Sequence, residues 1–556
     1  MPEPGPDGFN LATVFSTVAR AVPEQEVLVW RDRRLTYRAL DERADGLAHF
    51  LVERGLGCHT ERSALAGHES GQDHLGLYLR NGNEYLEGMV GGYRARVAPF
   101  NVNFRYVEEE LLYLLADART RALVYHAEFA PQVAAVRDRL PGLELLVQVA
   151  DESGNDLLPG AVDYEEALRT PEPAAGMPVP SGDDLFILYT GGTTGMPKGV
   201  LWRNDDIYVT SMGGTPFGTN EPYTSYDDIA AAATAGGGGM RLLMIPPFMH
   251  GAAQWSTFHT ITGGGTIVLP DDVHTLDAAD ALSTAIRERV VSIPVVGDAV
   301  ALPLVEEVER GDYDLSGLAA FNNGGAPLTP GLRDRILEAL PHIIVMDAAG
   351  ASETGLQMSS LSLKGMTAGT ATFAPVAATT VVDDLFTRVL QPGEGEGWLA
   401  QRGRVPLGYL GDAAKTSHTF PVIDGVRFSV PGDRALLAED GQIVLLGRDG
   451  VTINSGGEKI FVEEVERALA AHPDVRDVVV VGRPSRRWGS EPVAVVQLEA
   501  GSAATDADLL AETARHVARY KVPKAIVRVP RVQRSPSGKA DYRWAKAQAE
   551  LPQVSP

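Results

Sequence analysis

Short apolar runs alternate with amphipathic stretches along most of this chain, and the alternation predicts an α/β fold. The runs typical of buried strands are residues 123–125, 145–149, 185–188, 242–245, 266–269, 290–296 and 343–345. After the strand-like residues 35–37, apolar Leu40, Ala44, Leu47 and Leu51 recur at helical spacing. Strands that alternate with helices favour layered, largely parallel sheets.

Two regions near the C-terminus have a different pattern. Residues 398–446 are rich in glycine and proline between short apolar runs, which predicts strands joined by turns. The segment that follows predicts a helix at 462–470, strands at 475–481 and 492–498, and a helix at 506–519. We therefore expect a compact α+β unit at the end of the chain.

Composition favours a globular enzyme and argues against a membrane-spanning, secreted or nucleic-acid-binding protein. The chain has 556 residues, of which 44% are hydrophobic and 22% charged, which suits a globular enzyme of several folding units. No apolar run is long enough to span a bilayer, and residues 1–7 lack the features of a secretory signal. The lone Cys58 cannot form an internal disulfide, which favours the cytoplasm. A net charge of −24 argues against a nucleic-acid partner.

The most informative motif is a glycine- and threonine-rich loop that follows the apolar run at 185–188. Its residues are Thr190, Gly191, Gly192, Thr193, Thr194, Gly195 and, after Met and Pro, Lys198. Glycines let the backbone present N–H groups, and the lysine adds a point charge, so this chemistry suits a polyphosphate. The loop differs from the Walker pattern, because Gly199 follows the lysine.

Further clusters offer chemistry, although each alone is as well explained by an ordinary turn or helix cap. Ser352 and Glu353 follow the run at 343–345, where a carboxylate suits Mg²⁺. A loop of small residues allows a flat group to approach the backbone, and two positions offer a carboxylate and a guanidinium for ribose hydroxyls. These residues are Asn323, Gly324, Gly325, Asp433 and Arg448. Near the end of the chain lie a second glycine loop, Ser455, Gly456 and Gly457, and the lone Lys539.

Taken in order, these clusters resemble the adenylate-forming superfamily, which includes acyl-CoA synthetases, luciferases and peptide-synthetase adenylation domains. The resemblance covers about residues 20 to 545. Three segments, 101–106, 196–203 and 541–546, look more narrowly like bacterial fatty-acid and steroid-side-chain CoA ligases. The resemblance implies a domain over 1–447, built of layered α/β subdomains plus a β-barrel-like subdomain. It also implies a small, mobile α+β lid over 448–556.

The resemblance implies two half-reactions. A carboxylate attacks the α-phosphorus of ATP to give an acyl-adenylate, and a thiol, expected to be CoA, then displaces AMP. Catalytic roles fall to Lys539, Glu353, His250 and Lys198, with Mg²⁺ on Glu353. The phosphate loop from Thr190 to Lys198, together with Asn323, Gly324, Gly325, Asp347, Ser352, Asp433, Arg448 and Lys539, is expected to bind the nucleotide, and Ser455, Gly456 and Gly457 to approach the thiol.

Several positions depart from the family's pattern. Ala349 replaces the aromatic residue that stacks on adenine, and the hinge position is Gly450, with Asp449 as an alternative. Residues 55–73 form a longer and more polar segment than expected, and the sequence suggests no function for it. The motif at 244–255 matches the acyl-pocket segment and places His250 near the reacting carboxylate. Met240 and the glycines at 263–265 are expected to help line that pocket.

The substrate and acceptor stay open at this point. A steroid side chain, a medium-to-long fatty acid and an aryl acid all suit a pocket lined by small residues. A carrier-protein thiol is the alternative to CoA, and a non-catalytic nucleotide-binding protein is the alternative to an enzyme. Expected partners are therefore the acid, ATP and CoA, without a membrane segment. The sequence leaves open whether the protein forms a homodimer.

Overall fold

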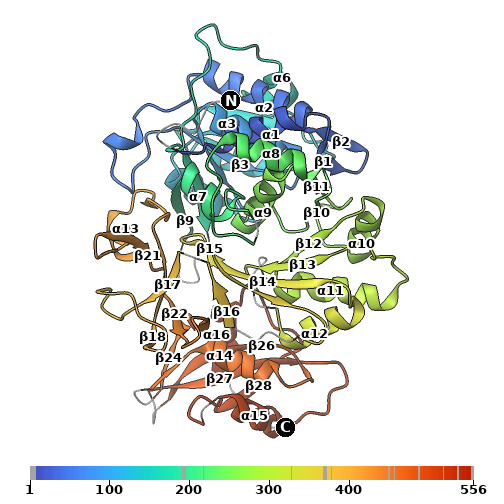
Figure 1. Ribbon diagram of the computed structural model, residues 1–556, viewed down its shortest axis with the longest axis vertical. Helices are drawn as coiled ribbons and strands as arrows, with labels where there is room; N and C mark the ends of the chain where they lie inside the picture. The colour runs from blue at the N-terminus through green and yellow to red at the C-terminus, as the bar shows by residue number, and fades with distance from the viewer. Residues whose placement is uncertain are drawn as a thin grey trace.

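The computed structural model describes residues 8–190, 196–216, 218–326, 328–366, 372–376, 378–448, 451–455, 458–485, 489–517, 519–534 and 538–551. A large N-terminal domain contains two sheets and a smaller C-terminal domain contains a third, which lies below them in Figure 1. The apolar runs at 123–125, 145–149, 185–188, 242–245, 266–269, 290–296 and 343–345 all contribute to strands, as predicted.

The first sheet has eight strands in the order β19-β9-β8-β4-β3-β5-β6-β7. Its strands from β8 to β7 are mutually parallel, whereas β8 and β9 are antiparallel, as are β9 and β19. The bounds are β3 His74–Tyr78, β4 Ala98–Asn101, β5 Thr120–His126, β6 Leu145–Val149, β7 Val162–Asp163, β8 Leu185–Thr190, β9 Lys198–Arg203 and β19 Gly408–Tyr409.

The second sheet begins as a parallel α/β sheet and continues as an antiparallel one. Its parallel strands are β1 Glu26–Trp30, β10 Arg241–Leu243, β11 Thr266–Val268, β12 Ser292–Val295, β13 Ala320–Gly324 and β14 Ile344–Ala351, with β2 Arg33–Thr36 antiparallel at the edge. The antiparallel part contains β15 Gly355–Ser362, β16 Thr372–Pro375, β17 Thr379–Val382, β18 Gly395–Arg402, β20 Val422–Ile423, β21 Val426–Ser429, β22 Asp433–Leu437 and β23 Ile443–Arg448. The predicted strand-and-turn region at 398–446 contributes most of its strands to this part, whereas β19 belongs to the first sheet and residues 413–419 form helix α13.

Helices fill the space between the two sheets, and the largest core lies there. Helices α1, α2, α3, α8 and α9 pack on one another and bury apolar residues of both sheets. The helices of this domain are α1 Leu11–Ala21, α2 Tyr37–Glu53, α3 Asn83–Arg94, α4 Glu108–Asp117, α5 Ala130–Arg137, α6 Tyr164–Ala167, α7 Asn204–Ser211, α8 Tyr226–Gly236, α9 Gly251–Thr262, α10 Ala278–Arg287, α11 Gly297–Arg310, α12 Pro330–Ala339 and α13 Ala413–Thr419.

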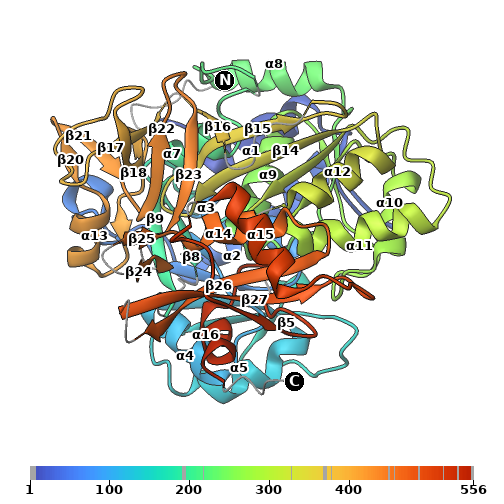
Figure 2. The same cartoon turned by 90° about the horizontal axis from the view of Figure 1, so that it is seen from below.

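The C-terminal domain is the α+β unit predicted from the sequence. Its strands are β24 Ile453–Ser455, β25 Glu458–Ile460, β26 Val475–Ser485, β27 Gly489–Leu498 and β28 Ala525–Arg528, and its helices are α14 Val462–Ala470, α15 Asp506–His516 and α16 Tyr542–Glu550. The helix predicted at 506–519 ends three residues early, because Val517 adopts an extended conformation. Figure 2 views the molecule from this domain's side.

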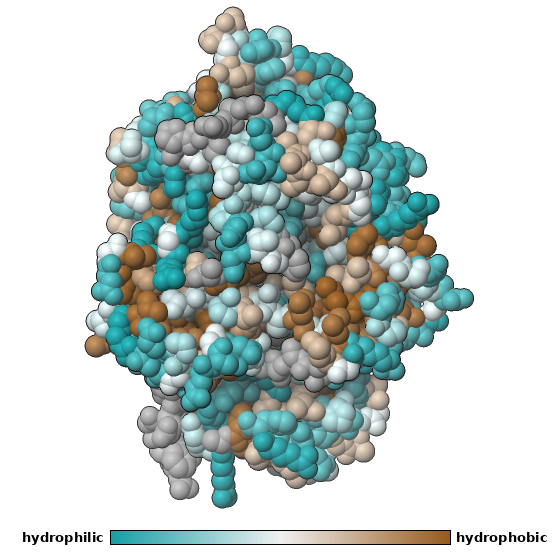
Figure 3. All heavy atoms as spheres, viewed as in Figure 1, coloured by the Kyte–Doolittle hydropathy of each residue, from teal (hydrophilic) through white to brown (hydrophobic). Residues whose placement is uncertain are grey.

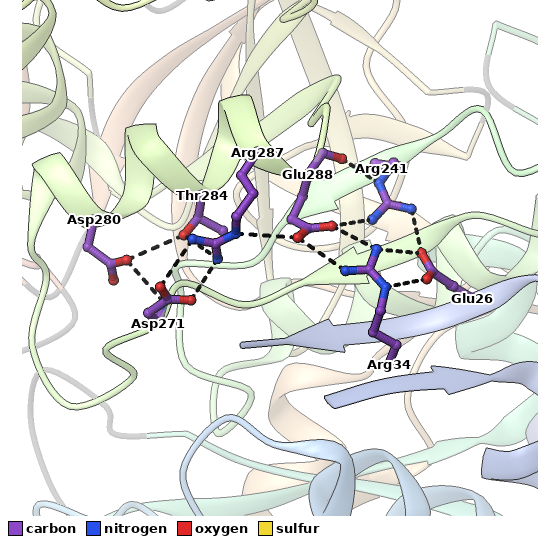
Figure 4. Close-up of polar contacts among 8 residues, drawn as sticks. All are labelled: Glu26, Arg34, Arg241, Asp271, Asp280, Thr284, Arg287 and Glu288. Carbon is purple, nitrogen blue, oxygen red and sulfur yellow. Dashed lines mark hydrogen bonds and ion pairs between the residues drawn. The ribbon is translucent and has the colours of Figure 1, made fainter. Parts of the chain in front are cut away.

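An ion-pair network connects the edge strand β2 and its neighbour β1 to β10 and the end of α10 (Figure 4). Glu288, only 7% exposed, accepts from Arg34 and Arg241 through Oε2 at 2.9 and 3.0 Å, and from Arg287 through Oε1 at 3.4 Å. Glu26 bridges Arg34 and Arg241 on the other side. Burial raises the pKa of Glu288, but the three arginines outweigh it, so the pKa is lowered overall.

We expect Glu288→Gln to lower the free energy of unfolding at pH 7 by about 1–3 kcal/mol, because a nearly buried carboxylate serves three arginines. A lowered folded-state pKa gives stability that is present above the unfolded pKa and is lost as pH falls through the folded value. Urea unfolding at pH 7 and pH 4 should therefore show less pH dependence in the variant. Glu309→Gln removes an exposed pair with Arg335 and should change stability by less than about 1 kcal/mol. Similar losses in both variants would contradict this assignment.

Candidate active site

Three neighbouring parallel strands bring predicted nucleotide-binding residues to one sheet edge. Asn323 on β13 lies opposite Asp347 on β14, and β12 on the other side leads into Gly297 at the start of α11. The carboxyl ends of parallel strands are where open α/β sheets bind ligands. This edge is therefore the candidate nucleotide site.

The Asn323 side chain organises this edge. Its Oδ1 accepts from the Gly297 N–H at 2.7 Å, and its Nδ2 donates to Asp347 Oδ1 at 2.9 Å and to the Ala326 carbonyl at 3.0 Å. Burial raises the pKa of Asp347 above its usual value, although the bond from Asn323 opposes that rise. Gly324 follows Asn323, and Gly325 adopts the left-handed conformation at φ +79°, so the chain turns sharply where a flat group was predicted to lie.

The phosphate loop connects β8 and β9 of the first, eight-stranded sheet. Thr190 ends β8 and pairs in register with Lys198, the first residue of β9. The predicted residues Gly191, Gly192, Thr193, Thr194 and Gly195 lie outside the described residues. Lys198 forms an ion pair with Asp412, which also caps α13 by accepting from the Lys415 N–H at 2.9 Å. The bond from Asp412 raises the pKa of Lys198, so the lysine carries a positive charge.

Glu353, the predicted Mg²⁺ residue, lies in the tight turn between β14 and β15. Tyr409 on β19 donates to its Oε1 at 2.8 Å, and Ser429 donates to its backbone carbonyl at 2.5 Å. Trp202 on β9 donates to the carbonyl of Ser352 at 2.8 Å. Within the described part of the chain, no donor contacts Oε2 of Glu353. One carboxylate oxygen is thus held by the protein and the other can meet a ligand.

The described residues contain no cluster of three or more His, Cys, Asp or Glu side chains that could hold a metal. Mg²⁺ is commonly bound by one or two carboxylates together with substrate phosphates and water. A single carboxylate, Glu353, hydrogen-bonded to the strand that pairs with β9, therefore fits that ion.

Tyr409 and Asp412 are functional candidates that sequence reasoning missed. Both belong to the short segment that runs from β19 into α13, and Lys415 at the start of that helix lies 4.0 Å from the centre of the Tyr409 ring. Tyr409 is 56 residues from Glu353 and Asp412 is 214 from Lys198. The pairing of β19 with β9 brings Asp412 to Lys198 and places Tyr409 on the strand next to β9, and no local spacing in the sequence indicates this pairing.

The polar segment 55–73, which the sequence left without a function, packs against this same region. The Gly411 N–H donates to the His68 carbonyl at 2.8 Å. A Cβ built on Gly67 would lie 2.4 Å from the carbonyl oxygen of Leu407, too close for any side chain. The segment thus supports the strand that carries Tyr409.

Buried amides hold the predicted acyl-pocket segment. Asn81 accepts from the Phe248 N–H at 2.7 Å, Asn101 donates to the Met249 carbonyl at 2.7 Å, and Gln254 donates to the Phe248 carbonyl at 2.8 Å. Asn101 also exchanges hydrogen bonds with the backbone of Tyr189 at the end of β8. It therefore joins the acyl-pocket segment to the strand before the phosphate loop.

The expectation that Met240 and residues 263–265 line the same pocket was wrong. Met240 immediately precedes β10, and residues 263–265 precede β11. They therefore lie at the amino ends of these parallel strands, on the side of the Arg241 ion-pair network, whereas the candidate site lies at the carboxyl ends. Helix α9 crosses the domain between the two edges, which the linear sequence did not reveal.

His250 is the residue immediately before α9, and its Nε2 is buried without a hydrogen-bond partner in the described part of the protein. Burial, together with the positive charges of Arg105 and Lys539, lowers the pKa of His250 to about 4. Lys539 belongs to the C-terminal domain, so that domain is docked with its predicted catalytic lysine near His250. Arg105 lies in the segment 101–106 that resembles CoA ligases, but its own position near His250 was not predicted.

We expect His250 to stay neutral between pH 5.5 and 8, because its folded-state pKa lies well below the ordinary value of about 6.5. NMR of ring-labelled histidine should give a midpoint near pH 4 for the resonance that His250→Gln removes. Lys539→Ala should move that midpoint upward, because a neighbouring positive charge is lost. A midpoint above pH 6 in the unaltered protein, or no change in Lys539→Ala, would rule out this arrangement.

The remaining predicted residues are only partly described. Asp433 begins β22, and its backbone lies opposite that of Arg448 on β23. The two residues were predicted to share a ribose site, but the structure does not describe the side chain of Arg448. Ser455 ends β24 and is buried, whereas Gly456 and Gly457 fall outside the described residues, as do the predicted hinge residues Asp449 and Gly450. The boundary at 447/448 stays a prediction.

Two family models match the chain. The AMP-binding enzyme model covers residues 15–410, and the model of the AMP-binding enzyme C-terminal domain covers residues 464–539. The chain belongs to the AMP-binding enzyme family. This confirms the resemblance to the adenylate-forming superfamily, and the AMP-binding enzyme described here is an AMP-forming acyl-CoA synthetase.

Relatives match this AMP-binding enzyme over nearly its whole length. The medium-chain acyl-CoA ligase Mig of Mycobacterium avium is 57% identical, covering 97% of this chain and 98% of the relative. The 3-oxocholest-4-en-26-oate–CoA ligase of Rhodococcus rhodochrous is 38% identical, covering 98% and 96%. ATP-bound MatB from Rhodopseudomonas palustris has the same fold, with a TM-score of 0.77 at 21% identity over 98% of this chain and 99% of MatB.

Proposed function

We propose that this acyl-CoA synthetase activates a medium-to-long-chain fatty acid or a steroid-side-chain acid and transfers the acyl group to CoA. The observation that carries the substrate class is the 57% identity to a medium-chain acyl-CoA ligase over nearly the full length of both chains. The 38% identity to a ligase for a steroid acid supports the second substrate. An aryl acid, or a carrier-protein thiol as acceptor, is the alternative.

In the first half-reaction a carboxylate oxygen attacks the α-phosphorus of ATP and pyrophosphate leaves. An anion must approach a polyanion, so the site has to oppose negative charge on the phosphate oxygens. Lys539, Lys198 and the loop from Thr190 to Gly195 would do this, and Glu353 would hold Mg²⁺ through Oε2. Bound Mg²⁺ supplies further charge neutralisation at the phosphates.

His250 would meet the acid as a neutral group. With its Nε2 buried and without a protein partner in the described residues, it can form a hydrogen bond to the carboxylate oxygen. A neutral imidazole leaves the carboxylate its full charge for attack on phosphorus, whereas an imidazolium would compete for it.

In the second half-reaction the CoA thiol displaces AMP and forms the thioester. Lys539 would move away with the C-terminal domain, and the loop of Ser455, Gly456 and Gly457 would come to the thiol. Glycine at position 450 permits the backbone rotation that such a hinge needs.

Pyrophosphate exchange tests the proposal directly. Purified protein with Mg²⁺ and ATP should incorporate labelled pyrophosphate into ATP only when a suitable acid is present, and AMP release should then require CoA. A screen of octanoate, palmitate, a 3-oxo-steroid-26-oate and benzoate would rank the substrate classes. Exchange with benzoate alone, or thioester formation on a carrier protein but not on CoA, would select the alternatives. Exchange with no acid in a broad library would overturn the proposal.

The described residues include no helix that is both long and apolar enough to cross a bilayer. Figure 3 shows a surface that is mostly hydrophilic toward its upper and lower ends, with hydrophobic residues gathered at mid-height.

We propose a cytoplasmic location on the basis of the single cysteine and the requirement for ATP and CoA. The homodimer stays a proposal that sedimentation equilibrium would test.

A further inference from the structure

Arg534 connects three parts of the structure close to Lys539. Its Nε and Nη2 donate to the two carboxylate oxygens of Asp477 on β26, at 2.9 and 2.6 Å. Its Nη1 donates to the carbonyl of Gly538, the residue before Lys539, at 3.3 Å. Its backbone forms an antiparallel bridge with Ala540, the residue after Lys539. Both peptide neighbours of Lys539 are therefore held by one residue.

The same part of the C-terminal domain rests on the start of α11 in the N-terminal domain. A Cβ built on Gly538 would lie 3.4 Å from the Val296 carbonyl oxygen and 3.6 Å from the Cβ atoms of Ala299 and Ala326. The backbone of Gly538 thus packs directly against this helix end. Farther along α11, Glu306 pairs with Arg476 of β26 at 3.4 Å.

Electrostatics agree with this docking. Asp298, in the first turn of α11, accepts from the Thr329 N–H at 2.8 Å. Burial raises the pKa of Asp298; across the interface the charge of Asp477 raises it further, while that of Arg534 lowers it. The positive charge of Arg534 therefore acts on a carboxylate of the other domain as well as on its own partner Asp477.

We propose that Arg534 is a positioning residue that fixes the backbone of Lys539 for adenylate formation. The inference rests on the proposed role of Lys539. Arginine suits this task because its planar fork can bind a carboxylate with two nitrogens and still direct a third N–H to a carbonyl. Lysine at this position could keep the charge but could not make all three bonds.

The test separates the two half-reactions in full-length protein. Arg534→Met should lower the rate of acid-dependent pyrophosphate release by about 10- to 100-fold, since a displacement of about 1 Å can cost that much. Thioester formation from supplied acyl-adenylate and CoA should stay within about twofold, and the KM values for ATP and acid should change little, because Lys539 acts in the reacting state. Arg534→Lys should be intermediate.

Arg528→Met is the matched control. Arg528 in the same domain also donates to a carboxylate, that of Asp506, and to a carbonyl, that of Ala504, at 2.8 and 2.9 Å, away from Lys539. The Arg528→Met variant should leave both half-reactions unchanged. Its melting temperature should be similar to that of Arg534→Met.

A double variant distinguishes positioning from a general loss of structure. If Arg534 acts through Lys539, adding Arg534→Met to Lys539→Ala should cause no further loss of the residual pyrophosphate release. Losses that multiply, or equal losses in both half-reactions, would overturn the inference, as would an Arg534→Met enzyme with a normal adenylation rate. Absence of acid-dependent turnover in the unaltered enzyme would instead refute the proposed function.

Discussion

Lys539→Ala should lower the rate of adenylate formation by at least about 10²- to 10³-fold, because it removes a preorganised charge from the reacting centre. The structure places this lysine close enough to His250 for its charge to act on the imidazole, so it is in position for the first half-reaction. Acid-dependent pyrophosphate release measures the loss. Thioester formation from supplied acyl-adenylate should be spared, because the phosphorus chemistry has then already occurred.

The control for this result is Lys546→Ala, which removes an exposed lysine of α16 in the same domain and should leave both half-reactions unchanged. If Lys539→Ala slowed both half-reactions equally, the lysine would not be specific to adenylation. Loss of thioester formation alone would assign it to the second step.

Glu353→Gln is the second change with a large expected effect. It keeps the shape of the side chain and an acceptor for Tyr409, but it removes the charge that we propose holds Mg²⁺. Adenylate formation should fall by about 10²-fold or more, and the Mg²⁺ concentration for half-maximal rate should rise. Initial rates of pyrophosphate release across a magnesium titration would measure both effects. Calorimetric titration of ATP with and without Mg²⁺, in the absence of acid, gives a readout that needs no turnover.

Tyr409→Phe should reproduce the magnesium effect in weaker form, by about tenfold, because one hydrogen bond to a charged group is lost. Tyr313→Phe removes a similar hydrogen bond, from a hydroxyl to Glu307 at 2.7 Å on the surface of α11, and should have no effect. An unchanged magnesium dependence in Glu353→Gln would assign the metal to another residue.

The hydrophobic pattern predicted several of the buried strands and the α+β character of the tail domain, since buried strands need apolar runs whatever their neighbours. Other strands, such as β3, β4 and β28, were not predicted. The order in which the strands pair within each sheet could not be predicted from the hydrophobic pattern. Pairing of β9 with β19 joins residues about 200 positions apart and brings Asp412 to Lys198. The hydrogen bond from Tyr409 to Glu353 depends in addition on how the turn after β14 packs against β9. Residues 263–265 were misplaced because the sequence does not show that α9 crosses the domain.

The sequence predicted where a residue lies when its own loop determines its position, as with Glu353 directly after β14, whereas its role toward Mg²⁺ stays a prediction. The family's motifs did not reveal the residues that hold those motifs in place. Asn323 shows the difference, because its side chain bonds Gly297, Ala326 and Asp347 at once, whereas its sequence context indicates only a turn.

The close fit of residues 55–73 against the strand of Tyr409 bears on how this enzyme can be re-engineered. Gly67 and Leu407 come from opposite ends of the N-terminal domain's sequence, yet neither backbone leaves room for the other to shift. Chimeras that exchange segment 407–412 with a homologue would therefore have to carry residues 55–73 along as a matched insert. In this chain the two stretches form a single module for recombination, although 340 positions separate Gly67 from Leu407.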